Sequence, residues 1–340
     1  MFRIFSVLGS LFLLSILLFS CQQKSSLKWE AEEANVHSIP FYKSIQDFKN
    51  NADPKTIAAF KEKHPHFMDI YFNDLLPWKA EGTFDEQLAQ FKEFLSYDDY
   101  SNLVDTVVLT YKNTDKVDAS IEKLLKHIKA IDHQFITPDT VYYFITGLNY
   151  YYSVILDDHN IGVGLDMFLG GDFPHYQNIE YPIPDFMLNK MESRHIPLWI
   201  AQNIYLDAFR PQIENEDLLS LMIQKGKEFY FLEQVLPDLP AHEIFGYSKE
   251  QMKWAEDNER NIYNYLLQNE LIYSKDPTKI LRYVSETHST SGLSPESPGN
   301  LGSFIGWKIV RSFASEKSDF HQILDAKTDV NFLKQSKYKP

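Results

Sequence analysis

The chain has 340 residues, and its 47 Asp and Glu outnumber its 33 Lys and Arg, which gives a formal net charge of −14. No run of Lys and Arg is long enough to neutralise a phosphate backbone, so the composition argues against nucleic acid as a partner. The single cysteine, Cys21, rules out an intramolecular disulfide. Stability must therefore come from the core, for which the 44% hydrophobic and 15% aromatic residues are sufficient.

The N-terminus has the pattern of a lipoprotein signal peptide. One charged residue, Arg3, precedes a run of apolar or small residues from Ile4 to Phe19, and a serine comes directly before Cys21. We interpret residues 1–20 as a signal peptide that is cleaved off and Cys21 as the lipidation site. The alternatives are an ordinary secretory signal and a short transmembrane anchor, but the run is shorter than the roughly 20 residues that span a bilayer.

We expect residues 21–28 to form a polar tether. We expect residues 29–340 to form a single globular domain, because they contain no linker-like segment and no internal repeat. Apolar residues at helical spacing predict helices over 84–95, 117–128 and 218–236, one that begins near Pro197, and one that runs from a capping box at Ser248 and Gln251 to Leu266. Runs of β-branched and aromatic residues predict strands over 141–145, 151–156 and 161–165. The expected fold is α+β and predominantly helical, with a small β-sheet at about 138–166.

Sequence motifs for metal or nucleotide binding are missing from the chain. The eleven histidines are scattered, and His242-Glu243 is not followed by the second histidine of a zinc-binding HExxH helix. His64-Pro65-His66 is more typical of an exposed turn than of a ligand pair. There is no Gly-x-Ser-x-Gly elbow and no phosphate-binding loop. We therefore predict no metal and no cofactor.

A glycine-rich turn is the first candidate site. The predicted strand at 161–165 leads into Asp166-Met-Phe168-Leu-Gly170-Gly, which is followed by Asp172 and Tyr176. Glycine permits a positive φ angle, so Gly170 is interpreted as structural and Phe168 as part of the core. We predict Asp166, Asp172 and Tyr176 as partner contacts, although Asp166 is also suited to cap the turn.

The second candidate site runs from Leu293 to Arg311. Pro295, Pro298 and Gly299 predict a rigid loop. Glu296 and Asn300 on that loop are predicted to be exposed partner contacts. In the helix that follows, Gly302 and Gly306 lie on one face, where they allow close packing, and Arg311 is placed to pair with a buried carboxylate.

These two stretches, together with Ile244-Phe-Gly-Tyr247, Trp254, Asn258-Glu259 and the ending Gln335–Pro340, resemble the gliding-motility lipoprotein GldB family of Bacteroidota. The resemblance covers nearly the whole chain after the signal peptide. It implies a role in gliding and in the linked type IX secretion apparatus, and it implies no established enzymatic activity.

A more distant likeness is to the layout of predicted zinc peptidases. The HExxH frame of those proteins would fall near 201–205, and their Glu-Gly pair near Lys225-Gly226, so every expected ligand would be absent. The likeness implies a degenerate zincin-like peptidase scaffold without its catalysis.

The leading hypothesis is a non-catalytic lipoprotein, anchored in the outer membrane through Cys21 and facing the periplasm. It would support gliding and secretion by contacts with other envelope proteins. A metal-dependent hydrolase is the alternative, and its site would have to be assembled from distant residues such as His159, Asp166 and His175. Carbohydrate capture is a third hypothesis, because lipidation is combined with abundant aromatic residues.

Overall fold

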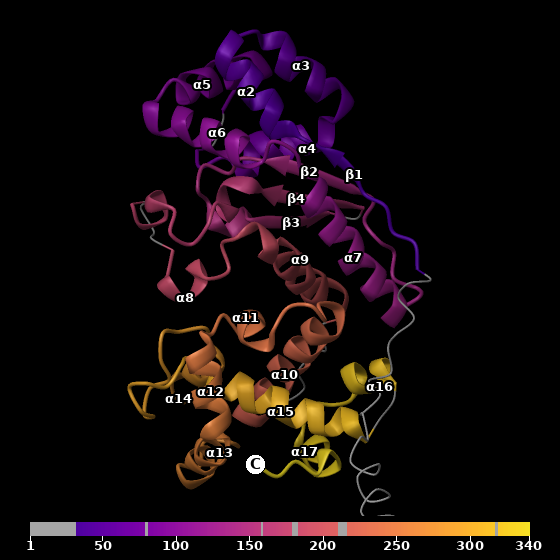
Figure 1. The fold of residues 1–340 in the computed structure, drawn as a ribbon, viewed down its shortest axis with the longest axis vertical. Coiled ribbons are helices and arrows are strands. Elements are labelled where there is room, and N and C mark those ends of the chain that lie inside the picture. The colour runs from indigo at the N-terminus through magenta and orange to yellow at the C-terminus, as the bar shows by residue number, and fades with distance from the viewer. Residues whose placement is uncertain (1–31, 79–80, 158, 179–182, 210–215, 317–318) are drawn as a thin grey trace, which may run out of the picture.

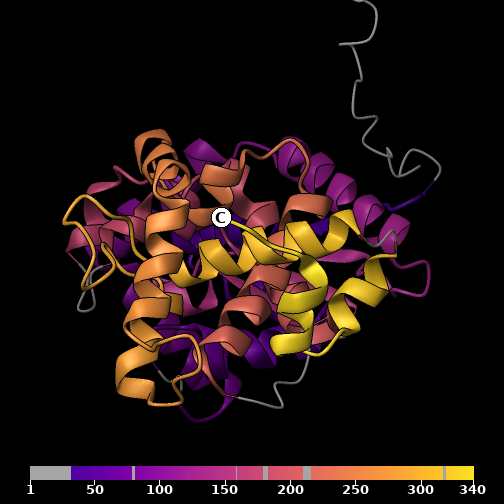
Figure 2. The same cartoon turned by 90° about the horizontal axis from the view of Figure 1, so that it is seen from below.

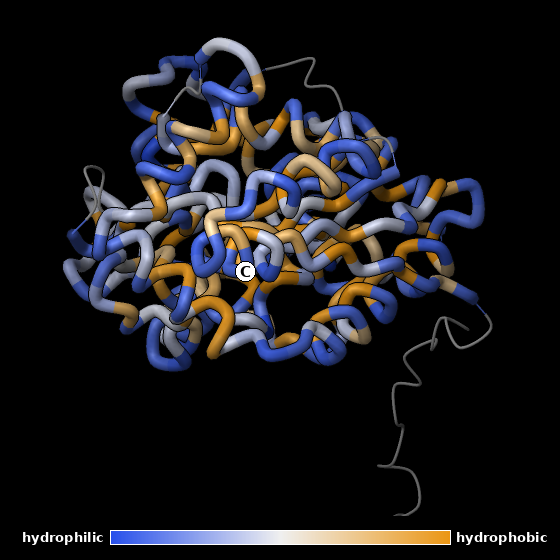
Figure 3. The backbone as a smooth tube through the Cα atoms, turned by 90° about the horizontal axis from the view of Figure 1, so that it is seen from above, coloured by the Kyte–Doolittle hydropathy of each residue, from blue (hydrophilic) through white to orange (hydrophobic). Residues whose placement is uncertain are grey.

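The computed structural model describes residues 32–340, apart from 79–80, 158, 179–182, 210–215 and 317–318. The predicted signal peptide, Cys21 and the tether therefore lie outside the described residues. As the sequence pattern predicts, the fold is α+β and predominantly helical, with one small sheet. Hydrophobic segments run through the interior of the molecule, and the outermost turns are mostly hydrophilic (Figure 3).

The sheet has four strands in the order β1-β2-β4-β3, and their bounds are β1 His37–Ile39, β2 Thr140–Phe144, β3 Val154–Asp157 and β4 Asn160–Gly164. β2 is parallel to both β1 and β4, whereas β3 and β4 form an antiparallel hairpin. The sequence pattern did not predict β1, because three residues are too few to show an alternating pattern. The sheet therefore draws one edge strand from a segment about a hundred residues away in sequence.

The first half of the chain encloses the sheet. Its α-helices are α2 Phe41–Asn51, α3 Pro54–Lys63, α4 Pro65–Ile70, α5 Phe84–Leu95, α6 Asp98–Thr110, α7 Asp115–Ile131, α8 Asp185–Leu188 and α9 Ile196–Ile204. α2 packs on β2 and α9 packs on β3, so α2 to α6 lie on one side of the sheet and α7 and α9 on the other (Figure 1). The predictions of α5, α7 and the proline at the start of α9 are confirmed.

In the second half, all the regular elements of the described residues are helices, with a loop at 285–300 between two of them. Its helices are α10 Leu218–Val235, α11 Ala241–Phe245, α12 Lys249–Asp257, α13 Glu259–Gln268, α14 Pro277–Val284, α15 Leu301–Ser315, α16 Phe320–Asp325 and α17 Val330–Ser336. α10 and α15 form its centre, with α12 to α14 on one side and α16 and α17 on the other (Figure 2).

Two glycines allow α10 and α15 to cross at very short distance. A β-carbon added to Gly226 would clash with the backbone of Gly306, and one added to Gly306 would clash with the carbonyl oxygen of Met222. Gly302 of the same helix faces the carbonyl oxygen of Tyr283. Gly302 and Gly306 therefore occupy close packing positions, which is the role that the sequence predicts for them.

Two predicted elements differ from the structure. The strand expected at 151–156 begins only at Val154, because Asn149 accepts a hydrogen bond from the backbone N–H of Tyr151 and starts a 3₁₀ turn, Tyr150–Tyr152. The helix expected from the capping box at Ser248 to Leu266 is divided at Asn258, whose φ of −106° and ψ of 8° are not helical. The capping box itself is present.

Candidate functional site

Asp166 is a buried structural residue and is not exposed to a partner. It follows β4 in a 3₁₀ turn, and its carboxylate accepts hydrogen bonds from the backbone N–H groups of Thr146 (2.8 Å) and Leu148 (2.7 Å) and from the Thr146 hydroxyl (2.9 Å). Leu148 has a φ of +65°, so the carboxylate holds a turn that a leucine rarely adopts. Burial raises the pKa of Asp166, although these hydrogen bonds oppose the rise.

Tyr176 is also buried, so the prediction that it contacts a partner is wrong. Its hydroxyl donates to the carbonyl of Asp166 (2.8 Å) and accepts from the N–H of Leu169 (3.0 Å). Gly170 takes a φ of +111°, which an L side chain rarely adopts, and this agrees with a structural role. Asp172 is exposed, and its contact with a partner stays a prediction.

The loop before α15 contains one exposed and one buried candidate. Glu296 is exposed, as predicted. Asn300 is only 4% exposed and precedes α15 with a φ of +60°, so the prediction that it is an exposed contact is wrong. The loop is held from both sides, because Tyr247 Oη donates to the carbonyl of Gly299 and the Thr290 hydroxyl donates to the carbonyl of Pro298.

Arg311 lies on the solvent side of α15. Its guanidinium sits 4.7 Å from the centre of the Trp307 ring, and its Nε is 3.8 Å from a carboxylate oxygen of Glu233. Glu233 also accepts a hydrogen bond from the indole of Trp307 at 3.2 Å. The sequence predicts a carboxylate partner for Arg311, and that partner is the half-buried Glu233. The exposed part of the Arg311 side chain remains a candidate contact.

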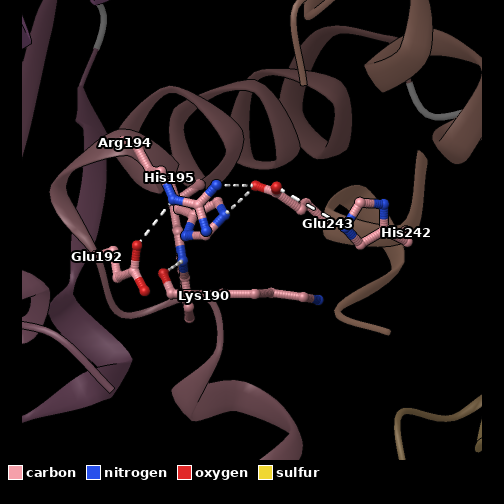
Figure 4. A network of polar contacts seen from close by, with 7 residues as sticks. Lys190, Glu192, Arg194, His195, His242 and Glu243 are labelled. Atoms are coloured by element: carbon pink, nitrogen blue, oxygen red, sulfur yellow. Dashed lines mark hydrogen bonds and ion pairs between the residues drawn. The ribbon is translucent and has the colours of Figure 1, made fainter. Parts of the chain in front are cut away.

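A cluster that the sequence did not reveal links the α8–α9 connection to α11 (Figure 4). Arg194 donates hydrogen bonds to the carboxylates of Glu192 (2.8 Å) and Glu243 (2.5 Å). Nε2 of His195 hydrogen-bonds with the same carboxylate of Glu243 at 3.0 Å. We call these four residues the α11 junction. The run of charges before the α9 helix, Glu192-Ser-Arg194-His195, was the available signal, but its partner lies about fifty residues further along the chain.

The pKa values at the α11 junction reflect both burial and charge. Burial lowers the pKa of His195, although its hydrogen bond with Glu243 opposes this. Burial acts to raise the pKa of Glu243, but the hydrogen bonds from Arg194 and His195 outweigh it and hold that pKa below its usual value. At neutral pH the junction therefore combines an ionised Glu243 and Arg194 with a neutral His195. Within the part of the chain that the structure describes, His195 Nδ1 has no hydrogen-bond partner.

Two hollows border α11. The first, which we call the α11 groove, has a volume of about 450 Å³ and is lined mainly by apolar atoms. Its lining residues are Ser120, Lys123, Leu124, His127, Arg194, Pro197, Val235, Leu236, Pro237, Asp238, Leu239, Pro240 and Glu243. The second, which we call the α15 pocket, has a volume of about 260 Å³ and a more polar lining. Its lining residues are Phe186, Asn189, Phe245, Gly246, Tyr247, Gln251, Glu286, Thr287, His288, Pro298, Gly299 and Asn300.

The residues of the alternative hydrolase site do not assemble. His159 and His175 are exposed, whereas Asp166 is buried and engaged by Thr146 and Leu148. Over the described ranges, no group of three or more His, Cys, Asp or Glu side chains is arranged to hold a metal ion.

The zincin-like layout is not supported either. Residues 201–205 lie at the end of α9, where Ala201, Ile204 and Tyr205 are buried apolar or aromatic side chains. Gly226 of the expected Glu-Gly pair is used for the close approach of α10 to α15. These positions therefore serve helix packing.

A comparison with protein families shows the family to which the chain belongs. Residues 22–340 match the family described as gliding motility protein GldB. The chain belongs to the GldB family. No curated protein and no solved structure matches it, and among the described residues no helix is long and apolar enough to cross a membrane.

Two of the motifs that carry the resemblance to GldB meet at the α15 pocket. Ile244 to Tyr247 form the end of α11 and the turn after it, and Phe245, Gly246 and Tyr247 line the α15 pocket. Pro298 and Asn300 face the same pocket from the loop before α15. Of the candidate contacts that were predicted from the sequence, the structure brings only Asn300 into a hollow.

Proposed function

We propose that this GldB family member is a non-catalytic lipoprotein that supports gliding motility and the associated type IX secretion machinery through protein contacts. It is anchored to the outer membrane by acyl chains on Cys21 and faces the periplasm, where it binds other gliding and secretion proteins of the envelope. Two features support this proposal: the match to GldB over residues 22–340 and the hydrophobic run that ends before Cys21.

The observation that carries the protein-contact function is the α11 groove. Leu124 and Val235 form its buried floor, and Leu239 forms part of its half-buried wall. Ion pairs at the rim, Lys123 with Asp238 and Arg194 with Glu243, place charges of both signs around an apolar centre. An apolar concave centre with a polar rim is the arrangement found at protein interfaces.

A pair of leucine variants tests this function in cells. Leu239→Ser reduces the apolar wall of the groove, whereas Leu109→Ser changes a leucine that is 70% exposed on α6, outside the groove lining. We expect Leu239→Ser to impair gliding and to weaken the cross-linking of the protein to its envelope partners, while Leu109→Ser does neither. Thermal melts separate lost binding from lost folding. Normal gliding and normal cross-linking in Leu239→Ser would remove the groove from the proposal.

The anchor is tested separately. Cys21→Ala should prevent incorporation of a fatty-acid analogue and release the protein from membranes, because acyl chains at this residue provide the membrane affinity. Equal labelling of the wild-type protein and Cys21→Ala would contradict the lipoprotein assignment.

The alternative, a metal-dependent hydrolase, is tested by metal analysis of protein purified without chelator. We expect no stoichiometric metal and no peptide cleavage. One metal ion per chain, lost together with activity in His159→Ala or His175→Ala, would favour the hydrolase.

A further inference from the structure

The α15 pocket is built from α8, the end of α11 and the stretch between α14 and α15. Phe186 comes from α8, Phe245 and Tyr247 from the end of α11, Glu286 from the loop after α14, and Asn300 from the start of α15. Its volume of about 260 Å³ suits a single side chain, because it is below the usual range of pockets for whole small molecules.

Asn300 is the polar group in this pocket that the protein leaves unsatisfied. Its side chain makes no capping bond to α15, and its Oδ1 is buried with no hydrogen-bond partner among the described residues. A buried amide oxygen without a hydrogen-bond partner lowers stability by roughly 1–3 kcal/mol. Its φ of +60° lies in the left-handed region, which asparagine tolerates better than most residues and glycine adopts freely. A ligand that hydrogen-bonds to Asn300 would compensate for this unfavourable placement.

The charges around the pocket cancel. Glu286 lines it with a side chain that is 37% exposed, and Glu286 Oε1 accepts a hydrogen bond from Lys190 Nζ at 2.9 Å. Lys190 lies behind the glutamate, with a side chain that is 4% exposed. A cationic ligand would therefore meet a carboxylate that is already neutralised, and an anionic ligand would meet that carboxylate at close range. A neutral ligand with N–H donors suits the pocket better than either.

Gln251 offers a complementary group. Its Oε1 accepts a hydrogen bond from the backbone N–H of Ser248 at 2.8 Å, so its amide nitrogen is the end available for donation. The ring of Phe245 stacks on Phe229 with centroids 3.8 Å apart, which holds one aromatic wall in place. The pocket thus combines acceptors at Glu286 and Asn300, a donor at Gln251 and a fixed aromatic surface.

We propose that the α15 pocket binds the side-chain carboxamide of an asparagine or glutamine in a partner polypeptide. A carboxamide carries two N–H donors and one acceptor on a planar, uncharged group, which matches the groups of the pocket and pairs with the amide of Asn300. The choice of a polypeptide rests on the proposed function, in which the protein acts through protein contacts.

The test uses the full chain and short peptide probes. The isotope-labelled protein is titrated in an NMR experiment with acetyl-Gly-Gln-Gly-N-methylamide, and with the matched peptides that contain Glu or Lys in place of Gln. We expect saturable shifts of the signals of Tyr247, Gln251 and Asn300 with the Gln peptide, and binding at least about tenfold weaker with the two charged peptides, because a pocket built to hydrogen-bond a neutral amide rejects them.

Asn300→Gly is the decisive variant, since glycine tolerates a positive φ and only the carboxamide is removed. It should melt at the wild-type temperature or above, because the unsatisfied buried oxygen is removed, but it should bind the Gln peptide at least about tenfold more weakly. Ser291→Ala, an exposed change on the same loop and outside the pocket lining, is the matched control and should bind as the wild type does. The proposal is overturned if no probe saturates, if the Glu or Lys peptide binds as well, if Asn300→Gly binds normally, or if N-acetylglucosamine binds more tightly than the Gln peptide.

The failure of this inference can be distinguished from failure of the proposed function. If Leu239→Ser impairs gliding and the Gln peptide does not bind, only the assignment of the α15 pocket is lost. If the peptide binds but Leu239→Ser glides normally, only the assignment of the α11 groove is lost.

Discussion

The Asp166 turn and the α11 junction are both organised around one carboxylate, but only the first is closed to solvent. Asp166 is fully buried, and backbone N–H groups and a hydroxyl supply its hydrogen bonds. Glu243 is partly exposed and is bound by Arg194, whose side chain is 56% exposed, and by His195. The first carboxylate maintains a backbone turn, and the second joins an exposed arginine and a buried histidine at the edge of a groove.

The difference lies in what removal of each carboxylate leaves behind. Without Asp166, the N–H groups of Thr146 and Leu148 lose their acceptor in the interior, where water cannot replace it. Without Glu243, Arg194 can still reach water and Glu192. A polar residue thus belongs to the scaffold when its partners are backbone groups of a distant turn. It stays available for contacts when it is itself partly exposed and has an exposed partner, as Glu243 has in Arg194.

The largest effect is expected for Asp166→Ala. The substitution removes the acceptor of the buried N–H of Thr146 and of the half-buried N–H of Leu148, so the free energy of unfolding should fall by about 3 kcal/mol. Chemical denaturation measures the change. Asp172→Ala, which removes an exposed carboxylate from the same turn, is the control and should change stability by less than about 0.5 kcal/mol. Equal effects of the two variants would contradict the distinction between closed and open carboxylates.

Gly306→Ala tests a closed contact between two helix backbones, where packing and not a carboxylate is decisive. The added methyl group collides with the carbonyl of Met222, so we expect a loss of about 1–3 kcal/mol from overpacking between α10 and α15. Ser315→Ala, at an exposed position of the same helix, should be close to neutral. A melting temperature for Gly306→Ala equal to that of the wild type would show that the two helices can separate without cost.

A smaller, pH-dependent effect is expected at the α11 junction. Because the pKa of His195 is lowered in the folded protein, the unfolded chain binds more protons as the pH falls through its ordinary pKa of about 6.5. Stability should therefore fall as the pH decreases through this range. His64 and His127 also have lowered pKa values and contribute in the same direction. The contribution of His195 is obtained by comparing how the free energy of unfolding changes with pH in the wild type and in His195→Gln. The variant should lose less stability than the wild type between pH 7.5 and 5.5. Parallel profiles would mean that His195 titrates normally.

The smallest effect on stability is expected for Glu296→Ala. The side chain is exposed, so the free energy of unfolding should change by less than about 0.5 kcal/mol. Gliding of cells that carry this variant then reports on contact alone. A clear drop in melting temperature would mean that Glu296, like Asp166, stabilises the fold.

Much of the secondary structure was predictable because it depends on local spacing. α5, α7 and α10 show long amphipathic or apolar patterns, and the capping box at Ser248 identified the start of α12. α2, α3, α4 and α6 were not predicted. For α3 and α4 a local signal did exist, since each has proline in its first turn, at Pro54 and Pro65. β1 offered none, because its pairing with β2 depends on residues about a hundred positions away.

The candidate site was less predictable than the fold, because polarity does not indicate exposure. Asp166, Tyr176 and Asn300 are polar residues in glycine- or proline-rich segments, yet all three are buried. Their burial depends on the distant segments that pack over them. Lys190 and His195 were not predicted for the same reason, since their partners Glu286 and Glu243 lie on other elements.

The position of β1 determines which contacts of the fold would first resist a pull on the N-terminal end of the chain. The described chain begins at residue 32, and the first strand, His37–Ile39, pairs with β2 over three residues only. Beside it, the N–H of Val36 is bonded to Glu122, and the carboxylate of Glu32 is paired with His133 on the segment that follows α7. Tension transmitted from an N-terminal anchor would therefore act first on this short parallel pair and on the side of α7. The helices around α10 and α15 lie further along the chain. The force would therefore reach them only after these contacts had broken.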